Sequence, residues 1–206
     1  MSSTVANSHP AHKDYEGAKL GMWLFLFTEI ILFGGLFILY SAYRARYPID
    51  FHNGGQALNT VIGVANTVIL LTSSLTVAIS ISALQKGNRK LSMSCLTATI
   101  IFGLLFLANK YFEWSHEIHE GLYPNGPELL KRPDGEKLFY GLYYCMTGLH
   151  GLHVLAGVIV LSVMLLFIRR NVITSTDFSK LENAGLYWHL VDVIWIFLLP
   201  LLYLAA

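Results

Sequence analysis

Two histidines stand near the middle of a long apolar stretch. Residues 147–157 have the sequence TGLHGLHVLAG, in which His150 and His153 are three positions apart. Ionisable residues inside a membrane-length segment are rare and often functional. Spacing of three places both rings on one helical face, where they could bind a metal, a haem or a neighbouring helix. A metal shell normally needs three or four ligands, so hydrogen bonding within a helical bundle is the favoured interpretation.

Glu29 is a single carboxylic acid in another apolar stretch. It stands ten residues into that stretch, which at about 1.5 Å per residue is near the centre of a bilayer. A lone carboxyl group at this depth is expected to be protonated at neutral pH. Two interpretations remain open: Glu29 is a proton-relay or coupling group, or it is a neutral acid hydrogen-bonded to another helix or subunit.

A third cluster lies in the string YWHLVD at residues 187–192. His189 and Asp192 are three apart, so the carboxylate could orient the imidazole. No serine or cysteine nucleophile stands in a suitable turn, which excludes a hydrolase triad. The favoured role is a buried structural ion pair or a contact with a lipid headgroup.

The last cluster lies at the end of the third apolar stretch, where Lys110 and Glu113 precede the string HEIHE at residues 116–120. The histidines of a zinc-protease helix are four apart, whereas these are three apart. The sequence therefore predicts an ion pair of Lys110 with Glu113 at the membrane boundary, followed by a solvated helix end rather than a metal site.

The composition indicates which structural elements position these residues. The chain has 206 residues, of which 54% are hydrophobic and 13% charged, far fewer charges than the quarter typical of soluble domains. Five stretches reach the roughly 20 residues that a membrane-spanning helix needs. We predict an all-α fold, a polytopic transmembrane helical bundle that is one domain over residues 1–206. Its spans are 20–43, 58–84, 91–114, 139–167 and 186–204, with an external loop at 115–138.

The second span carries a polar stripe that repeats every seven residues, at Asn59, Asn66, Ser73 and Ser80. Small and weakly polar residues on one stripe let helices approach closely and hydrogen-bond across the contact. A polar channel lining would have a similar pattern. Because no ionisable group lies on the stripe, packing is favoured.

Charge gives the expected orientation. The net charge of +1 gives no indication of a nucleic-acid partner. Residues 1–18 lack the basic start and short apolar core of a signal peptide, so the first span is expected to be retained. The basic residues divide eight to five between the two sides, which predicts a cytoplasmic N-terminus and an external C-terminus in the cell (inner) membrane. The two sets are Lys13, Lys19, Lys86, Arg89, Lys90, Arg169, Arg170 and Lys180 against Arg44, Arg46, Lys131, Arg132 and Lys137.

Taken in order, these motifs resemble subunit III of haem–copper terminal oxidases. The resemblance begins at Lys19 with KLGMWLFLFTEIILFGGLF and covers most of the chain. It continues through Asn66–Thr67, Leu70–Leu71 and Ser73–Ser74, and then Tyr111 with Glu113. The strings GLHGLHVLAG and YWHLVDVIWIFL, in the fourth and fifth spans, are its most specific parts.

The resemblance implies a non-catalytic subunit that stabilises a respiratory complex. Such a subunit has no haem or copper of its own, because these lie in partner subunits, and oxygen is reduced to water with proton pumping in subunit I. It would pack against subunit I, contact subunit II and other oxidase subunits, bind phospholipid and support proton uptake. Glu29 falls at the family's carbodiimide-reactive glutamate. Structural or lipid-associated roles are implied for His150, His153, His189, Asp192 and Glu113, and no catalytic residue or metal ligand is expected.

The chain departs from many members of that family, which have seven helices, two of them before the span that starts here at Leu20. Five-helix forms occur in quinol oxidases, in some cytochrome oxidases and in homologues associated with nitric oxide reductase. A glutamate at position 29, rather than aspartate, favours the cytochrome c type. Two other classes remain as alternatives: an autonomous proton-coupled carrier, for which inverted repeats and broken helices are missing, and a haem- or metal-binding membrane anchor.

Overall fold

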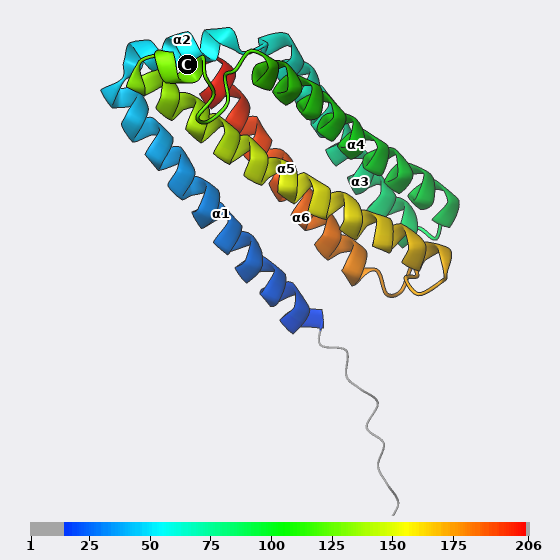
Figure 1. Ribbon diagram of the computed structural model, residues 1–206. Coiled ribbons are helices and arrows are strands. Elements are labelled where there is room, and N and C mark those ends of the chain that lie inside the picture. Colours follow the sequence, from blue (N-terminus) through cyan, green and yellow to red (C-terminus); the bar gives the residue numbers. More distant parts are fainter. Residues whose placement is uncertain (1–14, 205–206) are drawn as a thin grey trace, which may run out of the picture.

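The computed structural model describes residues 15–204, which form a bundle of long helices without β-strands in that range (Figure 1). Five helices are long and apolar enough to cross a membrane, which confirms the predicted all-α, five-span fold. Lys13 and most of the segment considered for a signal peptide lie outside the described residues. The five helices are α1 (Tyr15–Arg46), α3 (Thr60–Gln85), α4 (Arg89–His119), α5 (Asp134–Arg169) and α6 (Ser179–Leu199), and the last continues into a short π-helical segment, η2 (Pro200–Leu204).

The helices extend beyond the apolar stretches that predict them. The connection expected at 115–138 shortens to residues 120–133, with one 3-10 turn, η1 (Leu129–Lys131). Polar residues continue a helix once its core turns are formed, because each added residue gains a backbone hydrogen bond. Asparagine side chains begin two of the helices: Asn59 accepts from the backbone of α3 and Asn88 from that of α4. Asn59 is therefore a helix cap rather than part of the packing stripe.

A short helix that the sequence did not predict, α2 (Pro48–Ala57), covers one end of the bundle beside η2 (Figure 1). Its Phe51 is fully buried, and the ring packs edge-on against Tyr40 of α1 and Phe139 of α5. Tyr40 also donates a hydrogen bond to the Leu201 carbonyl oxygen at 2.8 Å. This end of the molecule, called the α2 end below, is thus sealed by aromatic packing.

The polar stripe of α3 makes the interhelical contacts expected of packing. Asn66 accepts from Asn109 of α4 at 2.9 Å, and Ser80 donates to the Ser92 carbonyl oxygen at 2.9 Å. Ser73 accepts from the indole N–H of Trp188 on α6 at 3.0 Å. The packing prediction is confirmed for these three positions of the stripe.

Trp188 is the point where four helices meet. Its side chain is fully buried, and two glycines let α4 and α5 close around it. A Cβ atom at Gly103 would lie 2.7 Å from Trp188 Cη2, and one at Gly157 would lie 2.7 Å from Trp188 Cε3. Both glycines are needed because the indole occupies the volume of a side chain.

Substituting alanine for Gly157 is expected to lower the free energy of unfolding by about 1–3 kcal/mol, since the new methyl group overlaps Trp188. The midpoint of thermal inactivation of the purified complex measures the effect. Gly151→Ala is the matched control on the same helix, because a Cβ there has no contact within 4 Å. Equal midpoints for the two variants would contradict the packing argument.

The first helix is the least embedded of the five. Between Glu16 and Arg46 it buries only Leu26, Phe33 and Tyr40, which are seven residues apart. Most of its other large apolar side chains are exposed, as expected of a helix in contact with lipid or with another subunit. Figure 1 shows α1 running beside α5 and α6 at the edge of the bundle.

Candidate functional site: a glutamate–histidine contact between α1 and α5

Glu29 of α1 contacts His153 of α5 midway along the two helices. The distance between Glu29 Oε2 and His153 Nε2 is 2.9 Å, and His153 Nδ1 lies 2.7 Å from the Leu149 carbonyl oxygen. From α6, the Tyr187 hydroxyl donates to the His153 carbonyl oxygen at 3.1 Å. Phe33 places its ring edge against the imidazole, with centroids 5.4 Å apart. Another helix thus supplies a hydrogen-bonding partner for Glu29, as one of the two interpretations of the sequence expects, and the proton-relay role stays a prediction.

The partners of His153 determine how many protons this contact holds. A carbonyl oxygen can only accept, so Nδ1 must carry a hydrogen and donate it to Leu149. Nε2 and a carboxylate oxygen would both be acceptors, so a 2.9 Å contact requires one proton between them. Whether the proton resides on Glu29 or on His153, the pair is neutral overall. Neutrality removes most of the cost of placing two ionisable groups at this depth.

The two histidines of TGLHGLHVLAG have different surroundings. His150 is fully buried between Phe106 and Trp195, with ring centroids 5.5 and 5.2 Å away. Neither of its ring nitrogens has a hydrogen-bond partner among residues 15–204. The expectation that both rings are hydrogen-bonded is confirmed for His153 and wrong for His150. In the part of the chain that the structure describes, no group of three or more His, Cys, Asp or Glu side chains is placed to hold a metal ion.

His189 and Asp192 do not form the expected pair. His189 Nδ1 lies 2.6 Å from the Ser74 hydroxyl of α3. Asp192 is buried, and no hydrogen bond or ion pair joins its carboxylate to His189 among the residues described. The ion-pair alternative is wrong, because Ser74 of α3 is the partner of the imidazole. The alternative of a contact with a lipid headgroup stays a prediction.

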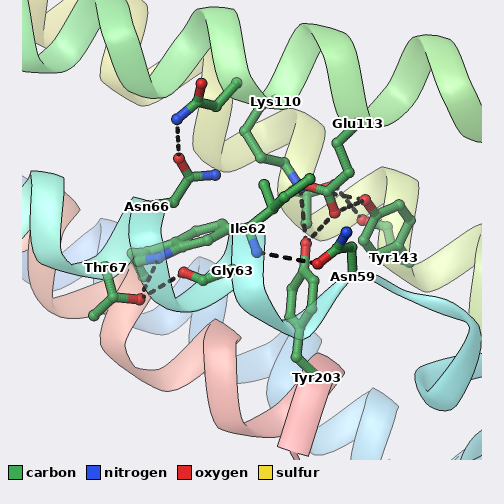
Figure 2. A network of polar contacts seen from close by, with 12 residues as sticks. Asn59, Ile62, Gly63, Asn66, Thr67, Lys110, Glu113, Tyr143 and Tyr203 are labelled. Carbon is green, nitrogen blue, oxygen red and sulfur yellow. Dashed lines mark hydrogen bonds and ion pairs between the residues drawn. The ribbon is translucent and has the colours of Figure 1, made fainter.

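A buried polar cluster joins α4, α5 and η2 (Figure 2). Lys110 Nζ lies 3.0 Å from Glu113 Oε2, 3.2 Å from the Tyr143 hydroxyl and 3.0 Å from the Tyr203 hydroxyl. Both hydroxyls donate to Glu113 Oε1. The expected ion pair of Lys110 and Glu113 is confirmed, but it lies in the interior, with 8% and 3% of the side-chain surfaces exposed. Sequence reasoning missed both tyrosines, and the only signal for them was a lysine inside an apolar stretch that had to find acceptors.

The end of α4 is only partly solvated. His116 and Glu120 form an exposed pair at 3.4 Å, and His119 is exposed, as expected. Glu117 is instead buried. In the adjoining connection, Arg132 donates to Glu136 at 2.8 Å, and this hydrogen bond raises the pKa of the guanidinium, which stays charged.

Two grooves flank the N-terminal half of α1. One, of about 480 Å³, lies between α1, α5 and α6 and has a mostly apolar lining that includes Met22, Phe25 and Ala156, with Lys180 and Asn183 on α6. The other, of about 370 Å³, lies between α1, α3 and α6 and includes Lys19, Trp23 and His189. Both combine apolar walls with at least one basic side chain.

These features define a multi-pass membrane protein in which most intramembrane polar groups join helices. The whole chain, residues 1–206, matches the family model described as cytochrome c oxidase subunit III. The chain belongs to the cytochrome c oxidase subunit III family.

Three relatives show the range of this similarity. Cytochrome c oxidase subunit 3 of Alkalihalophilus pseudofirmus is 34% identical over 97% of this chain and 93% of its own length. Cytochrome bo(3) ubiquinol oxidase subunit 3 of Pseudomonas putida is 30% identical over 95% of this chain and 89% of its own. Heme-copper oxidase subunit I+III of Aeropyrum pernix is 28% identical over 91% of this chain and 22% of its own.

Proposed function

We propose that this haem–copper oxidase subunit III packs against subunit I in the cell membrane, with further contacts to subunit II, and stabilises the complex without a cofactor of its own. Oxygen reduction and proton pumping would then take place in subunit I. The relative from Aeropyrum pernix supports the contact, because its name assigns subunits I and III to one protein. The exposed apolar surface of α1 is one face available for such a neighbour.

The electron donor of the complex is proposed to be cytochrome c. The relative at 34% identity is named a cytochrome c oxidase subunit, whereas the one at 30% is named a ubiquinol oxidase subunit. A quinol-oxidising complex is the second candidate for that reason. Oxidation of reduced cytochrome c or of ubiquinol by the purified complex separates the two.

Lipid binding is proposed for the groove between α1, α5 and α6. Its lining is mostly apolar, with Met22 and Phe25 on one wall and Ala156 on the other, which suits an acyl chain. Lys180 gives the groove a cationic group that attracts an anionic headgroup. His189, in the second groove, is hydrogen-bonded to Ser74, so its proposed role is structural as well as lipid-associated.

The Glu29–His153 contact supports a role in proton uptake. It holds one proton between two groups that can each carry it, next to the lipid-facing surface of α1. Such a pair can release and recover a proton with only a small change in geometry. This contact is the observation that carries the functional proposal.

Glu29→Gln is expected to leave the complex assembled and its haem spectrum unchanged, because a glutamine amide can still donate to His153 Nε2. The amide cannot exchange the shared proton, so the enzyme should inactivate after severalfold fewer turnovers and lose carbodiimide labelling at this position. Oxygen consumption followed to inactivation measures the effect.

Glu16→Gln, at the exposed start of α1, is the matched control and should behave as the unaltered protein does. A Glu29→Gln complex that lacks its oxygen-reducing centre would refute this version of the function. Unchanged turnover before inactivation would refute the proton role.

A further inference from the structure

One buried glutamate at the α2 end has no ion-pair partner. Glu117, in the last turn of α4, is 4% exposed, and its Oε2 has no hydrogen-bond partner among the residues described. The other two buried glutamates of this end are paired, Glu113 with Lys110 at 3.0 Å and Glu136 with Arg132 at 2.8 Å. As a carboxylate, Glu117 therefore places a negative charge in the interior that no ion pair within the described part of the chain balances.

The register of α4 and α5 brings tyrosine hydroxyls to the level of Glu117. These consecutive helices pass each other in opposite directions, and the Tyr143 hydroxyl of α5 donates to Glu113 of α4 at 2.8 Å (Figures 1 and 2). One turn closer to the α2 end, the same two helices present Glu117 and Tyr140. Tyr140 is fully buried, and neither its hydroxyl nor that of Tyr144 has a partner in the range described. The charge of Glu117 acts on both hydroxyls.

These oxygens have the chemistry of a cation site. A buried carboxylate without a counter-charge is strongly destabilising, and a cation removes that cost. Hydroxyl oxygens complete the coordination of a hard cation through their lone pairs. The position on the helix favours the same ligand, because the C-terminal end of α4 carries a partial negative charge. Glu120, in the same end of α4, adds a further carboxylate.

The charge to be balanced determines the kind of cation. Glu113 and Glu136 already have cationic partners, so Glu117 contributes a single negative charge. Ca²⁺ takes about six to eight oxygen ligands, commonly from several carboxylates. Within residues 15–204, no group of three or more His, Cys, Asp or Glu side chains is placed to hold such an ion. One carboxylate with two neutral hydroxyls matches a monovalent cation.

We propose that Glu117, together with the hydroxyls of Tyr140 and Tyr144, binds a monovalent alkali cation, Na⁺ or K⁺, between α4 and α5 at the α2 end. The bound cation would join the last turn of α4 to the first turns of α5, on either side of the 120–133 connection. The charge distribution predicts that this end is external, so the cation would enter from the external medium. The inference goes beyond the proposed function and does not involve the Glu29–His153 pair.

The dependence of thermal stability on alkali cations tests the site in the intact oxidase. The midpoint of thermal inactivation is measured at increasing NaCl or KCl, with choline chloride keeping the ionic strength constant. A ligand that binds only the folded state stabilises it in proportion to the logarithm of its concentration once the site is mostly filled. We expect the midpoint to rise by a similar increment for each tenfold increase above the dissociation constant.

Glu117→Gln removes the charge with little change of shape and should abolish this rise. Glu120→Gln is the matched control, because Glu120 lies at the same end of α4 in an exposed pair with His116. The control should respond as the unaltered protein does. Cation sites elsewhere in the complex affect all three proteins alike, so the difference between the variants measures this site. An equal rise in Glu117→Gln and Glu120→Gln overturns the proposal.

Tyr140→Phe tests the hydroxyl ligand and keeps both the ring and the carboxylate. The rise in midpoint should then require a severalfold higher cation concentration, and this variant decides the matter if Glu117→Gln does not assemble. An unchanged response in Tyr140→Phe contradicts the proposed coordination.

Infrared spectroscopy of the oxidase distinguishes a bound cation from a bound proton. A protonated carboxyl group has a C=O stretching band that a carboxylate lacks. We expect the spectra of the unaltered protein and of Glu117→Gln at neutral pH to differ in the carboxylate bands alone. Loss of a carboxylic acid band in Glu117→Gln would show that a proton balances the charge and would refute the cation site.

Discussion

Replacing Lys110 by methionine is expected to lower the free energy of unfolding by about 3–5 kcal/mol, the largest effect anticipated for a polar residue of this chain. The ammonium group contacts Glu113 and two tyrosine hydroxyls in the interior. Without it the Glu113 carboxylate would stay buried with no cation, and a buried unpaired charge costs far more than a lost surface contact. The midpoint of thermal inactivation and the retention of this subunit on purification measure the loss.

Two further variants define the origin of that loss. The double replacement Lys110→Met, Glu113→Gln removes both charges together and should recover much of the stability. Lys131→Met breaks an exposed pair, in which Nζ lies 2.6 Å from Glu128, and should cost at most about 1 kcal/mol. If Lys110→Met were as mild as Lys131→Met, the interior cluster would contribute little.

Replacing Trp188 by alanine is expected to cost about 3–5 kcal/mol, because it empties the space that four helices share. The indole is fully buried, it fills the gap beside Gly103 and Gly157, and it donates to Ser73. Thermal inactivation of the purified complex again reports the change, together with the yield of assembled subunit in membranes.

Trp188→Phe retains a ring but not the N–H donor, so it should lie between the alanine variant and the unaltered protein. Trp23→Ala is the matched control, since Trp23 is 56% exposed on α1, and a small effect is expected there. An equal loss at both tryptophans would show that burial at the four-helix contact is not the cause.

Much of the fold follows from the sequence because a membrane-spanning helix is a local property of composition and length. The polar stripe of α3 was also predictable, because a period of seven residues places the side chains on one helical face. The helix α2 was not, because residues 48–57 include Pro48, Gly54 and Gly55 and have no clear apolar face. Their structure depends on Phe51, which packs against rings from α1 and α5, and such tertiary contacts override local propensity.

The residues of the candidate site could be predicted from the sequence, but their contact partners could not. Intramembrane polar residues are visible in a sequence, so Glu29, His153 and Glu113 could all be selected. Their contacts join residues that are far apart in the chain: Glu29 and His153 are separated by 124 positions, Tyr203 and Glu113 by 90. His150 and His153 share a face only approximately, because three residues leave a rotation of about 60°. That rotation is enough to direct one ring to α1 and the other to Phe106 and Trp195.

The docking of α1 depends on the spacing of its three buried residues, Leu26, Phe33 and Tyr40, along the helix. It depends less on which apolar residues lie between them. Inserting one alanine between Phe33 and Tyr40 would rotate the helix after the insertion by about 100° relative to the helix before it. Either Tyr40 or the segment that holds Glu29 would then no longer face the bundle. Exchanging one apolar residue for another on the exposed surface of α1 would leave the spacing of the three buried residues unchanged. The first span can therefore diverge widely in sequence and still dock, provided that its length between these three side chains is kept.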